Sequence, residues 1–341
     1  MKRTYSILKN NRFVHDDYLL IPIRDEDKEL IRVWRNEQIE ILRQEKVLSR
    51  DDQDSYFKEV VSTLFEQDKP KQLLFSFFHK EKFIGYGGLV HIDWEKKEAE
   101  ISFLTETERN KSVNVFINDW KNYLYLIRLV AFGELKMECI FTCAYDLRPN
   151  LYKALESSGF RLTERIKNAV TIHGESKDVL IHSFLRNDIW FRNASESDVD
   201  LYYNWTNDPE VRKYSFHTDE IAYGTHVNWF KKKLNSQTCK LFLFLNAVNL
   251  PVGQVRIEIS DKASVIGISV NKEFRGKGFS TRMLKMASEE YVKLFPGQSI
   301  HAYIKHENTA SVKSFENAGF IFNGEGLVAD TKCLIYKFSV K

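Results

Sequence analysis

Residues 274–291, FRGKGFSTRMLKMASEEY, place two glycines between cations directly before a run with helical spacing. Arg275 and Lys277 alternate with Gly276 and Gly278, and glycine lets a backbone approach an anion closely. The first N–H groups of a helix have no partner within it, and the helix dipole is positive at that end. The pattern therefore predicts a phosphate-binding loop. A glycine turn that enters a helix, with solvated cations, is the alternative.

The glycine loop matches neither of two common nucleotide-binding fingerprints. The Walker pattern GxxxxGK[ST] is missing, and the dinucleotide pattern GxGxxG is incomplete. No acidic residue follows a second strand where dinucleotide binding requires one. The ligand of the loop must therefore be inferred from its surroundings.

The hydrophobic pattern around the loop predicts a series of strands and helices. After a strand that begins near Ile189, it predicts helices at 198–205, 223–234, 281–294 and 309–318, and strands at 240–247, 252–259, 265–270, 299–305 and 334–338. Gly319 follows the last helix, where a glycine often ends one. The glycine loop thus joins a strand to a helix in a mixed α/β (α+β) layer.

The chain also repeats itself. DKELIRVWRN at 27–36 and DVDLYYNWTN at 198–207 share Asp, Leu, Trp and Asn in register, and five further pairs of segments recur in the same order. Six echoes in one order indicate a duplicated domain, with a seam near 187–191. We predict one domain over residues 1–188 and a second over residues 189–341.

A second segment, HENTASVKSFENAGF at 306–320, narrows the class of ligand. Together with the loop it resembles the GCN5-related N-acetyltransferase (GNAT) family, whose cofactor is acetyl-CoA. The family loop Arg/Gln-x-x-Gly-x-Gly/Ala reads RGKGFS here, with Ser280 at the last position. The family's Asn after its fifth strand and its Gly-Phe after the next helix match Asn308 and Gly319–Phe320. The resemblance implies two tandem domains, each with a mixed, mostly antiparallel central sheet flanked by helices.

The resemblance also implies how acetyl-CoA would bind. Amides of residues 276–280 would grip the pyrophosphate, while the backbone of 268–270 and Asn308 would bind the pantetheine arm. The residues expected to bind the cofactor are Ile268, Ser269, Val270, Arg275, Gly276, Lys277, Gly278, Phe279, Ser280, Asn308, Ser311 and Phe315. Many members carry a Tyr at the position of Phe315, where it protonates the leaving thiolate. Tyr303 or a water could serve instead.

Acetylation of an amine requires a group that frees the nitrogen lone pair. The family often uses a carboxylate on or near its fourth strand, but residues 265–270 contain none. Glu258 and His306 are the candidate bases, and His217 and His226 are further candidates. For Glu258 the alternative is a solvent-facing residue of an alternating strand, and His306 could be an exposed residue at a helix start.

Residues 204–234 are rich in polar and aromatic side chains and form the expected acceptor site. The substrate-binding residues expected there are Asn207, Asp208, Arg212, Ser215, His226 and Trp229, whereas Trp205 is expected in the core. Together with Gln254 and Arg256, this segment resembles a subgroup of the family that acetylates 4-amino sugars on nucleotide carriers in pseudaminic or legionaminic acid type pathways. The resemblance implies a nucleotide-linked amino sugar as acceptor. A protein N-terminus or lysine, and a non-catalytic acyl-CoA-binding scaffold, are the alternatives.

The first half lacks the glycine loop. Residues 108–113, ERNKSV, fall where the loop should be, and Arg148 stands where Asn308 is expected. We therefore predict a degenerate acetyltransferase domain with a structural, dimerising or substrate-presenting role, and a homodimer is one expected form.

Charge and targeting features exclude several partners. Lys plus Arg is 50 and Asp plus Glu is 47, which gives a formal net charge of +3. Nucleic acid and membrane surfaces are therefore not expected as partners, and a small-molecule amine is. No signal peptide and no run of about 18 apolar residues is present, so a cytoplasmic location is predicted. The four cysteines lack zinc spacing, and no metal site is predicted.

Overall fold

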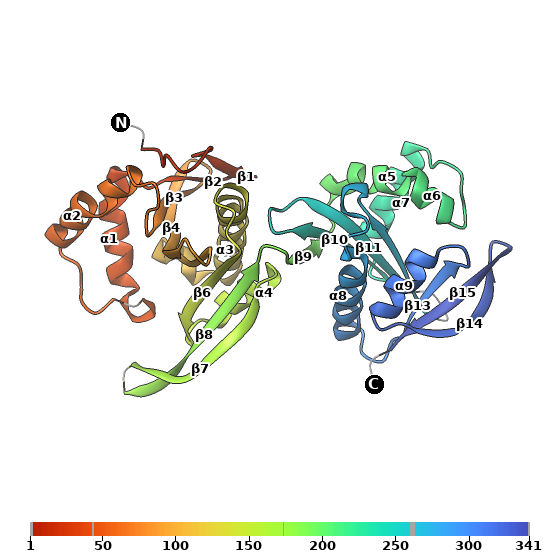
Figure 1. Cartoon of the computed structure of the whole chain (residues 1–341). Coiled ribbons are helices and arrows are strands. Elements are labelled where there is room, and N and C mark those ends of the chain that lie inside the picture. The colour runs from red at the N-terminus through yellow and green to blue at the C-terminus, as the bar shows by residue number, and fades with distance from the viewer. Residues whose placement is uncertain (1–2, 43, 173, 260–262, 340–341) are drawn as a thin grey trace. The chain divides into compact units, whose positions relative to one another are not determined.

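The computed structural model describes residues 3–42, 44–172, 174–259 and 263–339. The chain forms two compact units. Unit 1 comprises Met1–Trp190 and Asn246–Asn249, and unit 2 comprises Phe191–Leu245 and Leu250–Lys341. Each unit has its own sheet with its own helices (Figure 1).

Unit 1 contains an eight-stranded sheet in the order β1-β2-β3-β4-β5-β6-β8-β7. Its strands are Phe13–His15 (β1), Tyr18–Pro22 (β2), Leu73–His79 (β3), Lys82–Asp93 (β4), Glu98–Thr105 (β5), Cys139–Tyr145 (β6), Arg161–Ile172 (β7) and Glu175–Leu185 (β8). Its α-helices are Lys28–Glu37 (α1), Arg50–Glu59 (α2), Val113–Arg128 (α3) and Pro149–Ser157 (α4).

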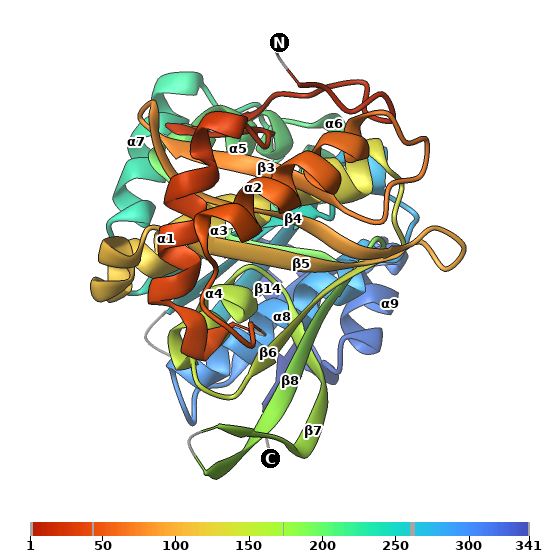
Figure 2. The ribbon, with the colours of Figure 1, turned by 90° about the vertical axis from the view of Figure 1, so that its left-hand side faces the viewer.

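Helices cover both faces of this sheet. On one face, Arg35 of α1 donates from Nη1 to the Tyr86 hydroxyl of β4, at 2.8 Å. On the other face, Tyr123 of α3 stacks on Phe103 of β5 with ring centroids 3.7 Å apart. The strand register pairs Tyr86 with Leu104, so Tyr86 and Phe103 point to opposite faces because side chains alternate along a strand. Figure 2 shows α1 and α2 crossing the face turned toward the viewer.

Unit 2 contains a seven-stranded sheet in the order β14-β15-β13-β12-β11-β10-β9. Its strands are Ile189–Asn193 (β9), Cys239–Asn246 (β10), Pro251–Ile259 (β11), Ser264–Val270 (β12), Ile300–Lys305 (β13), Ile321–Val328 (β14) and Thr331–Phe338 (β15). Its α-helices are Val199–Thr206 (α5), Pro209–Tyr214 (α6), Tyr223–Leu234 (α7), Phe279–Leu294 (α8) and Thr309–Asn317 (α9). Read from β9 to β14, the order is that of β2 to β7 in unit 1.

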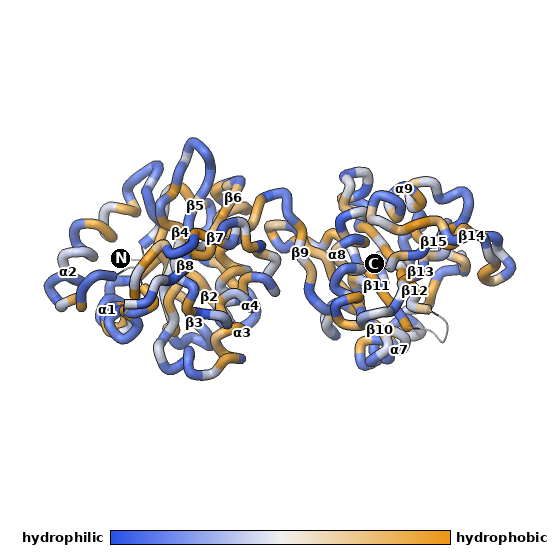
Figure 3. The backbone as a smooth tube through the Cα atoms, turned by 90° about the horizontal axis from the view of Figure 1, so that it is seen from below, coloured by the Kyte–Doolittle hydropathy of each residue, from blue (hydrophilic) through white to orange (hydrophobic). Residues whose placement is uncertain are grey.

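Helices lie on both faces of the second sheet as well. The guanidinium of Arg256 on β11 lies over the Trp229 ring of α7, 5.4 Å from its centroid. On the opposite face, a Cβ at Gly253 of β11 would lie 2.8 Å from Cε of Met283 on α8. Many of the buried apolar residues of both units lie on the strands of the two sheets. Figure 3 shows these hydrophobic stretches in orange along the backbone.

The structure confirms the predicted fold class, because both sheets are mixed, mostly antiparallel and flanked by helices. Helix α7 has the bounds predicted from sequence. Among the helices and strands described in unit 2, one α-helix and one strand were not predicted: α6, which has only six residues, and β14, which is largely exposed and contains Gly324 and Gly326. A helix of this length shows no periodicity, and glycines in a solvent-facing strand hide its pattern.

Each sheet contains one parallel pair of strands that separates early. Strand β5 pairs with β6 from Glu98 to Glu100, and β12 pairs with β13 at Ser264 and Val265. Over the rest of these strands, all of which the structure describes, no further pairing joins them. The unpaired edge of such a strand keeps free N–H and C=O groups. Each sheet therefore has an opening near its centre.

Candidate functional site

The glycine loop of unit 2 is built as an open turn before a helix. Strand β12 ends at Val270, a short 3-10 turn covers Lys272–Phe274, and Gly278 is the N-cap of α8. Gly276 and Gly278 have φ angles of 72° and 74°, and a Cβ on either would meet no atom within 4 Å. Residues 276–278 are exposed. The left-handed backbone that only glycine adopts readily thus turns the loop without filling the space before the helix.

The two cations of the loop are engaged by the protein itself. Arg275 donates from Nε to the Val270 carbonyl at 3.0 Å, and its Nη2 lies 2.8 Å from Oδ1 of Asp208. Lys277 donates to the Glu273 carbonyl at 2.8 Å. Arg275 therefore fixes the loop to the strand end and to α6, whereas Lys277 stays at the exposed surface of the loop.

Further residues expected at the cofactor lie on α8, on α9 or at the start of α9, and they differ in exposure. Ser280 and Ser314 join the two helices through their hydroxyl groups at 2.8 Å. Asn308 caps α9 by accepting from the Ser311 amide at 3.1 Å. Phe315 is only 3% exposed and packs edge-on against Phe320, with ring centroids 4.9 Å apart. Phe315 is therefore a core residue of unit 2.

The edge of β12 that faces β13 is open from Ile266 onward, because only Ser264 and Val265 pair across it. Ile268, Ser269 and Val270 all lie on this open segment. The open edge and the glycine loop are consecutive in the chain. An extended ligand with an anionic end could pair with the strand edge and place its anion at the start of α8.

Among the residues expected at the acceptor, three brace the segment between α5 and α7. Asn207 donates to the Ile221 carbonyl and accepts from the Ile221 amide, both at 2.9 Å. Asp208 caps α6 through the amides of Glu210 and Val211, and Ser215 donates to the Val211 carbonyl. These contacts hold the segment in one shape.

The remaining acceptor candidates differ in burial. His226 is 1% exposed, and its Nε2 lies 3.1 Å from the Val199 carbonyl. Burial lowers its pKa, which the Val199 contact partly opposes. His226 is therefore packed in the core of unit 2. Trp229 is half-buried under Arg256, and Arg212 donates to the Asp219 carbonyl at 3.1 Å.

Three catalytic candidates are separated by the fold. Glu258 forms an ion pair with Lys233 of α7, which holds the carboxylate at the end of β11. His306 is exposed in the turn after β13. Tyr303 is half-buried on β13, the strand across the opening from β12. Of these residues, Tyr303 is the one on a strand that borders the opening.

The sequence analysis missed two features of unit 2. The first is a set of buried polar atoms without a hydrogen-bond partner among the described residues: Gln254 Oε1, Arg256 Nε and Arg212 Nε. Such atoms need an explanation because burial without a partner is costly. The second is Lys305, which is 8% exposed and donates to the Lys213 carbonyl at 3.2 Å. A lysine closing an apolar strand was the available signal.

The Arg275–Asp208 pair makes unit 2 sensitive to acid. Desolvation raises the pKa of Asp208, but Arg275 and the amides of Val211 and Glu210 outweigh it, so the net pKa is lowered. A carboxyl with a lowered folded pKa stabilises the fold above its unfolded pKa and loses this contribution as pH falls through the folded value.

We therefore expect the thermal midpoint of unit 2 to fall more steeply in the wild type than in Asp208→Asn as the pH is lowered from about 5 to about 2. Asparagine takes up no proton. The variant should therefore have a lower thermal midpoint than the wild type near neutral pH, and its midpoint should fall less in acid. Glu210→Gln, at an exposed neighbouring carboxylate, is the control and should track the wild type. Parallel curves for wild type and Asp208→Asn would contradict the assignment.

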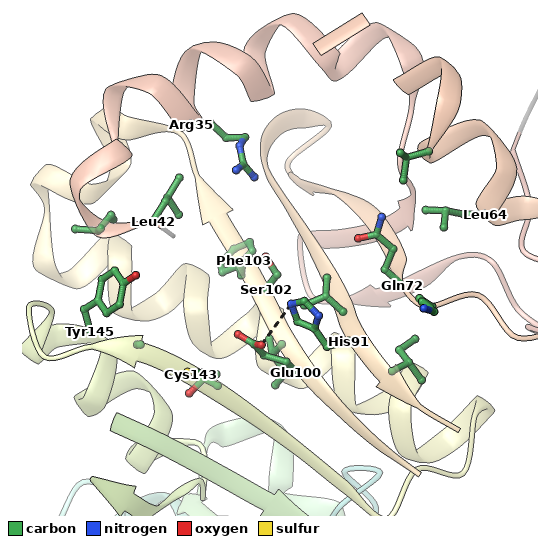
Figure 4. Close-up of a pocket in the computed structure, with 18 of the residues that line it drawn as sticks. Arg35, Leu42, Leu64, Gln72, His91, Glu100, Ser102, Phe103, Cys143 and Tyr145 are labelled. Atoms are coloured by element: carbon green, nitrogen blue, oxygen red, sulfur yellow. Dashed lines mark ion pairs between the residues drawn. The ribbon is translucent and has the colours of Figure 1, made fainter. Parts of the chain in front are cut away.

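Unit 1 holds a cavity of about 1060 Å³ that the sequence did not indicate. It lies between the α1–α2 layer and strands β4, β5 and β6, at the opening between β5 and β6 (Figure 4). Arg35, Gln72, His91, Glu100 and Tyr145 contribute polar groups to its wall. The one available signal was Glu100, a carboxylate in the strand sequence AEISFL.

Neither a metal cluster nor a membrane-spanning helix is found among the described residues. No group of three or more His, Cys, Asp or Glu side chains could hold a metal ion there. No helix in the same ranges is long and apolar enough to cross a membrane.

Comparison with known proteins defines the class. Models of the acetyltransferase (GNAT) domain match residues 20–181 and residues 188–321. The chain therefore belongs to the GNAT acetyltransferases and carries two such domains in tandem.

Solved structures of similar fold each match about one domain. They include a spermidine N-acetyltransferase from Vibrio cholerae in complex with CoA and spermine, at 18% identity and a TM-score of 0.39, covering 44% of this chain and 92% of that one. An aminoglycoside acetyltransferase in complex with coenzyme A matches at 16% identity and a TM-score of 0.39, covering 45% and 95%. A domain from Methanocaldococcus jannaschii matches at 21% identity and a TM-score of 0.40, covering 45% and 99%. No curated protein matches the sequence significantly.

Proposed function

We propose that unit 2 transfers the acetyl group of acetyl-CoA to a primary amine, and that the acceptor is an amino sugar on a nucleotide carrier. The observation that carries the cofactor assignment is the turn through Gly276 and Gly278, which leaves open space before the first amides of α8. A diphosphate fits this cradle because the helix start offers unpaired N–H groups and a positive dipole.

The chain's own residues would hold the cofactor as follows. Amides of residues 276–280 bind the phosphates, and the open edge of β12 at Ile268–Val270 pairs with the pantetheine arm. Asn308, at the start of α9, orients the same arm, while Arg275 keeps the loop in place through Asp208. Acetyl-CoA supplies an activated acetyl thioester.

The chemistry requires a neutral amine, a polarised carbonyl and a proton for sulfur. An amide bond forms between the acceptor nitrogen and the acetyl carbon, the carbon–sulfur bond breaks, and the nitrogen loses a proton while sulfur gains one. Unpaired N–H groups on the β12 edge would polarise the carbonyl. Tyr303 on β13 is our candidate for delivering the proton to sulfur. Among the candidate bases, Glu258 is held by Lys233, which favours His306 or a water.

The acceptor class rests on the resemblance of residues 204–234 to sugar acetyltransferases and on the face that carries Gln254 and Arg256. Their buried, unpartnered Oε1 and Nε atoms suit a hydroxylated, anionic ligand, because such a ligand provides both donors and acceptors. The ring of Trp229 beneath Arg256 adds a flat apolar wall.

Thiol release from acetyl-CoA with a panel of UDP-linked amino sugars tests this function. We expect turnover with at least one of them and none with the corresponding N-acetylated sugars, which lack a free amine. Turnover with peptide amines alone would show that the acceptor is a protein N-terminus or lysine and not an amino sugar. Tight CoA binding without turnover on any amine would favour a scaffold.

We further propose that residues 1–188 form a degenerate domain without cofactor chemistry and that residues 189–341 form the catalytic one. In unit 1 a 3-10 turn over Thr107–Lys111 and the N-cap Ser112 take the place of the glycine loop. Lys111 is exposed and pairs with Glu108 at 2.6 Å.

We expect Lys111→Gly to leave kcat and KM unchanged within measurement error. The substitution removes only an exposed ion pair, and such pairs contribute about 0–1 kcal/mol. Steady-state kinetics of the full chain provides the measurement. A rate loss of about 10-fold or more would show that the first domain takes part in the chemistry.

A further inference from the structure

Residues 208–220 of unit 2, here called the α6 segment, are closed at their base by one side chain. Asn207 donates to the Ile221 carbonyl and accepts from the Ile221 amide, both at 2.9 Å. Helix α6 lies within the segment, and two further side chains of the segment donate to its own backbone carbonyls. The α6 segment is therefore a self-braced unit between α5 and α7.

One end of the α6 segment is attached to the glycine loop. Asp208 caps α6 through the amides of Glu210 and Val211, and its Oδ1 also lies 2.8 Å from Nη2 of Arg275. Arg275 in turn donates from Nε to the carbonyl of Val270, where β12 ends. A displacement of the glycine loop must therefore either move the start of α6 or break this ion pair.

The other end of the α6 segment is attached to β13. Lys305, the last residue of β13, is only 8% exposed. Its Nζ donates at 3.2 Å to the carbonyl of Lys213, in the last turn of α6. A hydrogen bond from a charged group is stronger than one between neutral groups, and burial makes its loss more costly. This bond ties the end of α6 to the strand across the opening from β12.

The two attachments lie on opposite sides of the opening in the sheet. Strands β12 and β13 pair only at Ser264 and Val265 and separate beyond them. Arg275 follows the end of β12, and Lys305 ends β13. With six residues, α6 is about 9 Å long. It is thus held at its first turn from the β12 side and at its last turn from the β13 side.

Unit 1 repeats the closure and the first attachment with other residues. Asn36 donates to the Leu48 carbonyl at 2.9 Å and accepts from the Leu48 amide at 2.8 Å. Gln38 donates to the Thr105 carbonyl at 2.8 Å and accepts from Asn110 at 2.7 Å. These bonds attach the residues after α1 to the loop that follows β5. The attachment is therefore present in both units, although the loop of unit 1 lacks glycine.

We propose that Asp208 and Lys305 are positioning residues that make the glycine loop, the α6 segment and β13 move as one body. This inference rests on the proposed function, in which the loop takes the CoA phosphates and residues 204–234 take the acceptor. Occupation of the loop then stabilises the α6 segment through Arg275 and Asp208, on the acceptor side of the site. Both positioning residues act through α6 rather than on the reacting atoms.

Hydrogen exchange of the full chain, measured by peptide mass spectrometry, tests the coupling first without ligand. Lys305→Met keeps the apolar stem and removes the charged donor. We expect it to speed exchange by about 10-fold or more, both in the α6 segment and in residues 274–280. Lys213→Met is the matched control, because it changes an exposed side chain but keeps the carbonyl, and it should exchange like the wild type. Acceleration confined to the α6 segment would overturn the proposal.

Added CoA then tests the path of the coupling. In the wild type, saturating CoA should slow exchange in residues 274–280 and, by about 10-fold, in the α6 segment. Asp208→Asn should keep the first effect and lose the second, since asparagine caps a helix as well as aspartate does but carries no charge. A merely structural loss would speed exchange equally with and without CoA. Wild-type protection of the α6 segment in CoA-bound Asp208→Asn would overturn the proposal.

The two measurements separate this inference from the proposed function. Absence of CoA protection at residues 274–280 in the wild type would remove the cofactor assignment, whereas ligand-free exchange would still decide whether the three elements move together. If Lys305→Met does not fold, ligand-free Asp208→Asn decides instead. Its acceleration must then reach both residues 274–280 and the end of β13, and an effect limited to the first turn of α6 would contradict the coupling.

Discussion

Gly278→Glu is expected to abolish CoA binding while unit 2 stays folded. Gly278 is the N-cap of α8 with φ of 74°, and a Cβ there would meet no atom within 4 Å. The new side chain therefore causes no clash, and the left-handed backbone costs about 1–2 kcal/mol. Its carboxylate would stand in the proposed phosphate site, where charge repulsion and bulk oppose a diphosphate.

Gly297→Glu is a matched control for this variant. Gly297 also has a positive φ, 82°, with no atom within 4 Å of a built Cβ, and it follows α8 rather than preceding it. Both variants introduce the same strain and the same charge. Calorimetric titration should give wild-type CoA affinity for Gly297→Glu and none measurable for Gly278→Glu. Equal affinities for the two would remove the loop from the cofactor site.

A glycine follows α4 in unit 1 and another follows α9 in unit 2. We expect replacement by alanine to have very different effects at these two corresponding positions. Gly159 follows α4 with φ of 85°, and a Cβ there would lie 2.3 Å from Cβ of Trp190. Gly319 follows α9 with φ of 92°, and its nearest neighbour, the Phe338 ring, would lie 3.6 Å away. Gly319→Ala adds only backbone strain, about 1–2 kcal/mol. Gly159→Ala adds overpacking against the indole, a further cost of about 1–3 kcal/mol.

Hydrogen exchange measured by peptide mass spectrometry separates these effects, because a chain of two domains need not unfold in one step. We expect the free energy of opening of α4 to fall by about 2–5 kcal/mol in Gly159→Ala. In Gly319→Ala, the free energy of opening of α9 should fall only by the cost of backbone strain, about 1–2 kcal/mol. Equal losses in the two helices would mean that Trp190 moves aside easily.

The tandem fold separates features that a single GNAT domain could combine. Unit 2 has the glycine cradle, but its central strand carries Val265 where unit 1 carries Glu100. Unit 1 has the buried carboxylate and a large cavity, but Ser112 begins its helix where Gly278 begins α8.

The sequence by itself determined the class of fold, the repeat and the loop. Strand and helix periodicity is local. Gly276 and Gly278 act through backbone shape at their own positions, and Asn308 caps the helix that begins directly after it. These features were therefore visible in order along the chain. The short helix α6 and the exposed strand β14 were not, since neither carries a periodic apolar pattern.

Only the tertiary structure decided what the side chains do. His226 is polar in sequence, yet it is buried against the Val199 carbonyl. Arg275 lies in a loop but pairs with Asp208, 67 positions earlier in the chain. The cavity around Glu100 is formed by α1, by the consecutive strands β4 and β5, and by β6, which come from three separate parts of the chain. Such contacts depend on strand register and on the packing of helices on sheets, and a linear pattern does not specify either.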